Sequence, residues 1–317
     1  MTRILVTGAS GLLGANLALQ LHAAHEITGV THAHDLREPP FPVVMADLSV
    51  PGAGARLVDE MAPELVIHCA AMANLDACES QPGLALRVNG ELPGEMAGAC
   101  RRLGARFIQL STDAVFDGKR GGYIETDAPG PLNVYARTKL AGERSVTAAN
   151  PEALIARVNF YGWSPSGTRS LGELFYTSLA SGKGMMGFTD VFFCPLQVND
   201  LVDTLLEMDV KRLSGLFHTV SAESISKYDF GRAIARRFGF NEELIRPVSW
   251  REAGLKAARS PDLTLSTGKL SSALGHALPG QAAGLERFYT TFEARLPEKL
   301  RALLAVPADR VQNKEAL

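Results

Sequence analysis

The chain has 317 residues, of which 46% are hydrophobic and 21% are charged, and its formal net charge is −2. This composition can bury a large core, and the near-neutral charge excludes the basic surface that nucleic-acid binding needs. The four cysteines are dispersed and form no C-x-x-C pair, so the sequence predicts neither a disulfide framework nor a metal site, and it favours the reducing cytoplasm. No secretory signal or run of about 20 apolar residues is present, so we expect no membrane association.

The first half of the chain alternates short aliphatic runs with longer amphipathic ones. Strands are predicted at 3–7, 26–31, 42–46, 65–69, 106–110 and 153–158, and helices at 12–24, 54–61, 82–103 and 135–149. Strands that are apolar throughout and separated by helices indicate a parallel sheet covered on both faces. The predicted fold class is therefore α/β, with a doubly wound parallel sheet of the Rossmann type.

The pattern changes near residue 160. Glycine, serine, proline and aromatic residues dominate 160–193, where we expect loops and a helix, before a strand at 213–220 and a helix at 226–238; the stretch 261–278 is mixed. We therefore predict a dinucleotide-binding domain at 1–160, with a return segment near 190–212. A smaller C-terminal substrate lobe is expected at 161–305, followed by a polar tail at 306–317.

A glycine-rich turn follows the first predicted strand. Gly8, Gly11 and Gly14 form a G-x-x-G-x-x-G pattern that opens the first helix. Glycine permits the tight turn and lets the backbone approach a diphosphate at the positive end of the helix. The pattern predicts a cofactor loop made of Gly8, Ser10, Gly11, Leu12, Leu13 and Gly14.

The end of the second predicted strand distinguishes the two nicotinamide dinucleotides. NAD normally requires a carboxylate here to accept hydrogen bonds from the ribose diol, but this strand ends GVTH, and Asp35 comes only later. Thr31, His32 and Arg37 could instead accommodate a 2′-phosphate, so NADP(H) is favoured over NAD(H). The alternative for Arg37 is an ordinary solvated loop arginine.

Two further strand ends belong to the predicted cofactor site. Asp47 and Leu48 follow the third strand and resemble the adenine-edge contact of a dinucleotide-binding family named below. Cys69, Ala70 and Ala71 end the fourth strand, where small side chains would let a cofactor pass close to the backbone.

A tyrosine and a lysine four residues apart begin the helix that follows the fifth strand. Tyr135 and Lys139 share one helical face, and a nearby ammonium favours the phenolate of a proton-handling tyrosine. The fifth strand ends in Ser111 and Thr112, of which Thr112 is placed to hold a substrate carbonyl oxygen. Asn89, inside the long predicted helix, is either an orienting hydrogen-bond partner near the lysine or a structural asparagine.

Four runs carry a resemblance to a known family: HCAAMANLDACE, STDAVFDG, YIETDAPGPLNVYARTKLAGE and AARSPDLTLSTGKL. Together they resemble the dTDP-4-dehydrorhamnose reductase branch of the extended short-chain dehydrogenases/reductases, over residues 3–290. The resemblance implies NAD(P)H-dependent reduction of the 4-keto group of a nucleotide-linked sugar, with Thr112, Tyr135 and Lys139 as the catalytic trio. It also implies substrate contacts from Asp113 and Arg259, in a pocket where this chain departs from its relatives at Ala114, Phe160 and Tyr161.

Two other functions stay open. A nucleotide-sugar 4-epimerase uses the same trio, and a non-catalytic NADP-binding regulatory subunit would keep the fold. A 4,6-dehydratase would need an acid where Ala114 stands. The helices predicted at 82–103 and 135–149 are those that pair in dimers of this superfamily, which leaves a homodimer open.

Overall fold

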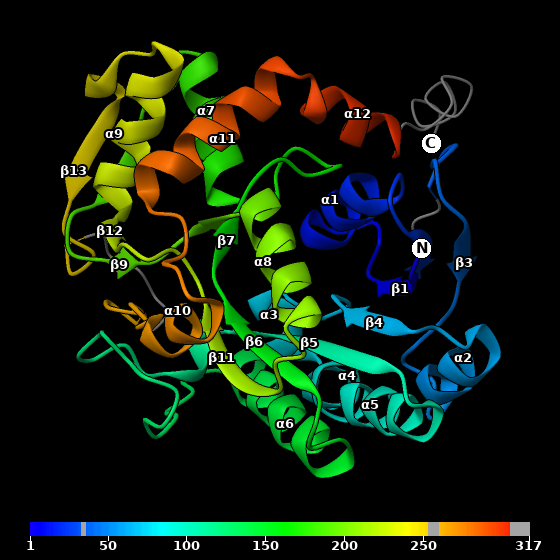
Figure 1. Cartoon of the computed structure of the whole chain (residues 1–317). Coiled ribbons are helices and arrows are strands. Elements are labelled where there is room, and N and C mark those ends of the chain that lie inside the picture. The colour runs from blue at the N-terminus through cyan, green and yellow to red at the C-terminus, as the bar shows by residue number, and fades with distance from the viewer. Residues whose placement is uncertain (33–35, 253–259, 305–317) are drawn as a thin grey trace, which may run out of the picture.

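The computed structural model describes residues 1–32, 36–252 and 260–304. In this part of the chain, seven parallel strands form a central sheet in the order β11-β6-β5-β4-β1-β2-β3 (Figure 1). The predicted doubly wound α/β sheet is confirmed. Its strands are β1 (Arg3–Thr7), β2 (Glu26–Thr31), β3 (Val43–Met45), β4 (Leu65–His68), β5 (Arg106–Thr112), β6 (Leu154–Val158) and β11 (Gly215–Thr219).

Helices cover both faces because successive strand residues point to opposite sides. In β1, Ile4 and Val6 pack into a core shared with α1 and α8, whereas Leu5 joins a second core with α2 and α5. The helices on the first face are α1 (Leu12–Leu21) and α8 (Val198–Val210), and those on the second are α2 (Ala53–Met61), α5 (Leu92–Leu103) and α6 (Val134–Ala149).

The long helix predicted at 82–103 is interrupted. A helix that the prediction missed, α3 (Leu75–Ser80), precedes α4 (Pro82–Leu86), a π-helical turn at Arg87–Glu91, and α5. Pro93 explains the wide turn, because it has no N–H to donate to the carbonyl of Asn89 four residues earlier. The Asn89 carbonyl faces α6 instead, where a Cβ on Gly142 would lie only 2.2 Å from it.

The second half of the chain builds a smaller lobe and returns to the sheet through α8 and β11 (Figure 1). An aromatic cluster holds this lobe together, with Trp163 stacked on Phe288 at 4.1 Å between ring centroids. Its helices are α7 (Leu171–Ala180), α9 (Lys227–Phe238), α10 (Gly268–Leu274), α11 (Gln281–Glu293) and α12 (Leu296–Ala302).

Short strand pairs complete the fold. They are β7 (Phe160–Tyr161) with β10 (Leu196–Gln197), β9 (Phe192–Phe193) with β12 (Ile225–Ser226), and β8 (Met185–Phe188) with β13 (Ile245–Val248); single 3₁₀ turns lie at Asp113–Val115 and Glu242–Leu244. The predicted tail at 306–317 lies outside the described residues. Within the described ranges, no helix is long and apolar enough to cross a membrane.

A buried ion pair ties α6 to the sheet. Arg157 on β6 donates from Nη2 to Glu143 Oε2 at 2.8 Å and from Nε to Oε1 at 2.9 Å, and both side chains are less than a tenth exposed. Ser111 on β5 donates to the same carboxylate at 2.5 Å. One carboxylate thus connects α6 to two neighbouring strands.

Glu143→Gln should destabilise the protein strongly. The substitution leaves the Arg157 charge buried without its counter-ion, a loss that costs about 3–5 kcal/mol. Urea unfolding measures the change in the free energy of unfolding. The matched control is Asp59→Asn, which breaks an exposed pair with Arg102 at 3.2 Å and should cost less than about 1 kcal/mol. Equal effects of the two substitutions would contradict this prediction.

Candidate active site

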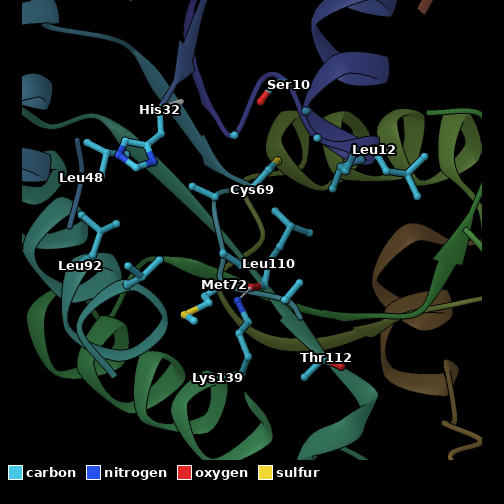
Figure 2. A pocket seen from close by; sticks show the side chains of 18 of the residues that line it. Ser10, Leu12, His32, Leu48, Cys69, Met72, Leu92, Leu110, Thr112 and Lys139 are labelled. Atoms are coloured by element: carbon cyan, nitrogen blue, oxygen red, sulfur yellow. Dashed lines mark hydrogen bonds between the residues drawn. The ribbon is translucent and has the colours of Figure 1, made fainter. Parts of the chain in front are cut away.

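A cavity of about 680 Å³ lies at the carboxyl ends of β1, β2, β4, β5 and β6. This is the edge at which open α/β sheets bind their ligands. Figure 2 shows Ser10 and Leu12 on one side, His32 and Leu48 at one end, and Lys139 and Thr112 on the other side. The cavity therefore brings together predicted residues from distant parts of the sequence.

The glycine loop forms one wall of this cavity. Gly8 has a φ of +68°, and the N–H of Gly11 donates to its carbonyl at 2.9 Å. A Cβ on Gly14 would lie 2.3 Å from the same carbonyl, so the chain fits only without side chains here. Helix α1 begins at Leu12, which directs its unpaired N–H groups into the cavity.

Polar side chains gather where β2 and β3 end. His32 Nε2 lies 3.5 Å from Asp47 Oδ1, and Ser49 donates to that carboxylate from its N–H and its hydroxyl. The Ser49 hydrogen bonds lower the pKa of Asp47, which therefore stays ionised. Thr31 lines the same end, and its buried hydroxyl has no partner within the described residues.

Arg37 is not brought to this site. Its side chain is exposed and is not among the described residues that line the cavity, and its backbone N–H donates to the carbonyl of Leu303 at 2.8 Å. This position favours the solvated-arginine alternative.

The end of β4 continues the cavity wall next to the glycine loop. Cys69, Ala70 and Ala71 line the cavity, as does Leu48. The Thr7 hydroxyl accepts the Ala70 N–H at 3.1 Å, which fixes this strand end beside the glycine loop. Burial raises the pKa of Cys69 to about 12, so the thiol is a neutral small side chain and not a nucleophile.

Thr112, Tyr135 and Lys139 meet across the floor of the cavity. Asn133 caps α6 by accepting the Ala136 N–H, so Tyr135 stands in the first turn and Lys139 one turn later. The ammonium of Lys139 donates to the Leu110 carbonyl at 2.6 Å.

Burial controls the protonation of this pair. It raises the pKa of Tyr135 to about 12, outweighing the hydrogen bond from Thr112 that favours the phenolate. It lowers the pKa of Lys139 to about 8, against the opposing charge of Glu143. The sequence predicted that the Lys139 ammonium would favour the phenolate of Tyr135. Burial instead dominates the pKa of Tyr135, so this side chain keeps its proton at neutral pH and can donate it.

Asn89 lies beneath the cavity and not in its lining. Its carboxamide accepts the Met72 N–H at 2.9 Å, and it donates to the Met72 carbonyl at 3.0 Å and to the Thr138 hydroxyl at 3.1 Å. Asn89 therefore links the loop after β4 to α6 beside Lys139, which agrees with an orienting position.

The residues predicted to contact the substrate are only partly found in the cavity lining. Asp113 and Phe160 line the cavity, whereas Ala114 and Tyr161 are absent from its described lining. Tyr161 is 1% exposed and packs edge-on against Phe230 and Phe288 in the core, so its predicted substrate contact is corrected. Ala114 sits in the 3₁₀ turn, its N–H bonded to Thr112. Arg259 lies outside the described residues.

The sequence reasoning missed several lining residues. Asn159 follows β6 at the same sheet edge as Thr112, so the strand-end rule could have found it; it donates to Asp113 Oδ2 at 2.5 Å. Burial raises the pKa of Asp113, and the Asn159 and Thr112 hydrogen bonds oppose that rise. Arg169 comes from an irregular loop that carries no motif. Apolar lining residues include Met72, Leu84, Val88 and Leu92.

Within the described part of the chain, no cluster of three or more potential metal ligands occurs.

Known proteins resemble this chain over most of its length. The family model of the RmlD substrate binding domain matches residues 1–294. The chain belongs to this family. A probable low-salt glycan biosynthesis reductase of Haloferax volcanii is 34% identical over 299 residues, covering 91% of this chain and 99% of that protein. The dTDP-4-dehydrorhamnose reductase of Mycobacterium tuberculosis is 33% identical over 273 residues, covering 84% and 85%.

A solved structure extends the comparison to three dimensions. The dTDP-4-dehydrorhamnose reductase of Bacillus anthracis, in complex with NADP, superposes with a TM-score of 0.76 at 26% identity, covering 92% of this chain and 99% of that one. The predicted resemblance is confirmed, and the chain is an oxidoreductase of the extended short-chain dehydrogenase/reductase type.

One relative belongs to a different functional class. The beta subunit of mouse methionine adenosyltransferase 2 is 31% identical over 255 residues, covering 78% of this chain and 75% of that protein.

Turnover should depend on the charge of Lys139. Its pKa of about 8 means that the ammonium predominates below about pH 8 and is lost as the pH rises further. We expect kcat/KM to fall roughly tenfold per pH unit above that point, as for a single essential ionisation. Lys139→Arg keeps the charge at high pH and should remove this decline, even at lower activity. An identical alkaline decline in that variant would exclude Lys139 as its source.

Proposed function

We propose that this protein reduces a keto group, at C4, of a nucleotide-linked sugar with NADPH. The observation that carries the proposal is the placement of Thr112, Tyr135 and Lys139 in one cavity with the glycine loop. A proton donor and a site for a diphosphate are the two parts that a nicotinamide-dependent carbonyl reductase needs.

The residues present fit a dinucleotide. Gly14 lets α1 pack directly against the Gly8 carbonyl, where a Cβ would collide with it, and the helix dipole of α1 favours a diphosphate at this tight turn. The unpartnered hydroxyl of Thr31 and the imidazole of His32 stand where β2 ends, in place of a carboxylate. That β2 itself ends without a carboxylate supports NADP(H) over NAD(H). The ionised Asp47 at this edge follows β3 and is engaged by Ser49 and His32.

The position of Thr112, Tyr135 and Lys139 in one cavity supports a catalytic role for each. A bound NADPH supplies the hydride for the carbonyl carbon. The Thr112 hydroxyl binds the carbonyl oxygen and holds it beside Tyr135, which donates its proton to that oxygen as negative charge develops. Lys139 supplies a buried positive charge next to the tyrosine and orients the ribose.

The substrate class is inferred from the reductases among the relatives, which act in glycan biosynthesis or on dTDP-4-dehydrorhamnose according to their names. Asp113 and Phe160 are proposed to contact the sugar, because both line the cavity near Thr112. We assign the dinucleotide to residues 1–160 with the return segment 190–212, and the sugar mainly to 161–305. The homodimer through α5 and α6 stays a prediction.

A non-catalytic subunit is the second candidate, because one relative is named as a subunit of another enzyme, methionine adenosyltransferase 2. It would bind NADPH yet fail to oxidise it with any of a panel of 4-keto nucleotide sugars in a single turnover. A 4-epimerase would instead retain tightly bound NAD(H) through purification. Stoichiometric oxidation of NADPH by a 4-keto nucleotide sugar supports the reductase.

Tyr135→Phe should abolish most of the activity while leaving the fold intact. The change removes only the hydroxyl, and general acid catalysis contributes about 10²–10⁴-fold. Steady-state oxidation of NADPH with the reducible sugar measures kcat, and fluorescence titration checks that NADPH still binds. A variant with near-normal kcat would refute the assignment of Tyr135 as the proton donor.

NADPH should bind more tightly than NADH, and His32→Asp should reverse or narrow this preference. The new carboxylate would repel a 2′-phosphate and accept hydrogen bonds from a free ribose diol. The ratio of the two dissociation constants is the measurement. Arg37→Ala is the matched control, and we expect it to leave the ratio unchanged because Arg37 lies outside the described lining. Equal affinities in the unmodified protein would contradict the preference.

A further inference from the structure

The loop between β7 and α7 is fixed by one buried carboxylate. Glu173 is 1% exposed and accepts hydrogen bonds from the Ser164 hydroxyl at 2.7 Å, the Arg169 N–H at 2.9 Å and the Ser170 N–H at 3.2 Å. Ser170 caps α7 in return by accepting the Glu173 N–H at 3.1 Å. The backbone at Arg169 is therefore held rigidly although it lies in an irregular segment.

This loop is also attached to the helix that follows the glycine turn. The Asn16 side chain donates to the Trp163 carbonyl and to the Leu12 carbonyl, both at 2.7 Å. Asn16 is 1% exposed, so the link is shielded from water. The start of the loop is thereby placed against the first turn of α1, whose residues Leu12, Leu13 and Gly14 line the cavity.

The side chain of Arg169 is exposed and lines the cavity. Within residues 1–32, 36–252 and 260–304, its guanidinium has no ion-pair partner. The two carboxylates of the lining are engaged elsewhere: Asp47 with Ser49 and His32, and Asp113 with Asn159. A fixed backbone and an unneutralised charge make Arg169 ready to bind an anion in the cavity.

We propose that Arg169 binds the diphosphate of a nucleotide ligand, opposite the N–H groups of α1. A planar guanidinium suits phosphate oxygens, and it would supply the full positive charge that the helix end provides only in part. Because Asn16 joins the loop to α1, the cofactor diphosphate is the expected ligand. The diphosphate of the nucleotide sugar is the other source of the same chemistry. The inference rests on the proposed function, since it requires a dinucleotide in the cavity.

The test compares Arg169→Gln and Arg169→Lys with the unmodified chain by fluorescence titration with NADPH. Loss of a charge-assisted contact should raise the dissociation constant about 10- to 100-fold for glutamine, with a smaller rise for lysine. Arg246→Gln is the matched control, an exposed arginine on β13 outside the described lining, and its affinity should not change. The affinity of the glutamine variant should also fall less steeply between about 0.05 and 0.5 M salt.

A second titration, with a nucleoside diphosphate in the presence of saturating NADP⁺, distinguishes the two sources. Weaker NADPH binding assigns the contact to the cofactor, and weaker nucleoside diphosphate binding alone assigns it to the substrate. Unchanged affinity for both ligands overturns the proposal. If the unmodified chain binds neither NADPH nor NADH, the proposed function itself fails. Equal melting temperatures of the variants would confirm that the comparison concerns binding and not folding.

Discussion

The shared carboxylate of Glu143 is the interaction on which the geometry of the active site depends. Tyr135 and Lys139 stand on α6, whereas Thr112 stands on β5, and only a fixed helix-to-strand register brings them together. Ser111 and Arg157 bind the same carboxylate from β5 and β6, so the register is set by short hydrogen bonds in a buried environment. Buried charge pairs add little net stability, but they tolerate few alternative arrangements.

Burial has a second effect in this region. Burial away from water raises the pKa of Tyr135 and lowers the pKa of Lys139. The same desolvation therefore keeps the phenol of Tyr135 protonated at neutral pH and lets the Lys139 ammonium, one helical turn away, titrate near pH 8. Neither effect requires a charged partner in contact with the phenol.

Where a local pattern decides the position of a residue in the fold, the sequence predicted the fold and which residues meet in the cavity. Short aliphatic runs predicted the strands of the sheet, and longer amphipathic stretches predicted most helices of the first half. The strand-end rule placed Gly8 and Thr112 at one edge, and the helix after β5 brought Lys139 there. The sequence did not predict the positions of side chains that depend on contacts between distant parts of the chain. Nothing local shows that Tyr161 turns into an aromatic core, or that the loop before α7 brings Arg169 to the cavity. The wide turn at Asn89 was readable only in retrospect, from Pro93 four residues later.

The described lining of the cavity comes mostly from the first half of the chain. Of its described residues, all but Phe160 and Arg169 come from residues 8–159, which also contain most strands of the sheet, most of its covering helices, and both Tyr135 and Lys139. Chemistry and scaffold are thus encoded together, whereas the surfaces that the second lobe presents to a ligand carry little of the catalytic geometry. A substitution that reshapes the described cavity lining therefore also acts on the sheet and the helices that pack on it. Ligand preference and folding stability are constrained by the same residues.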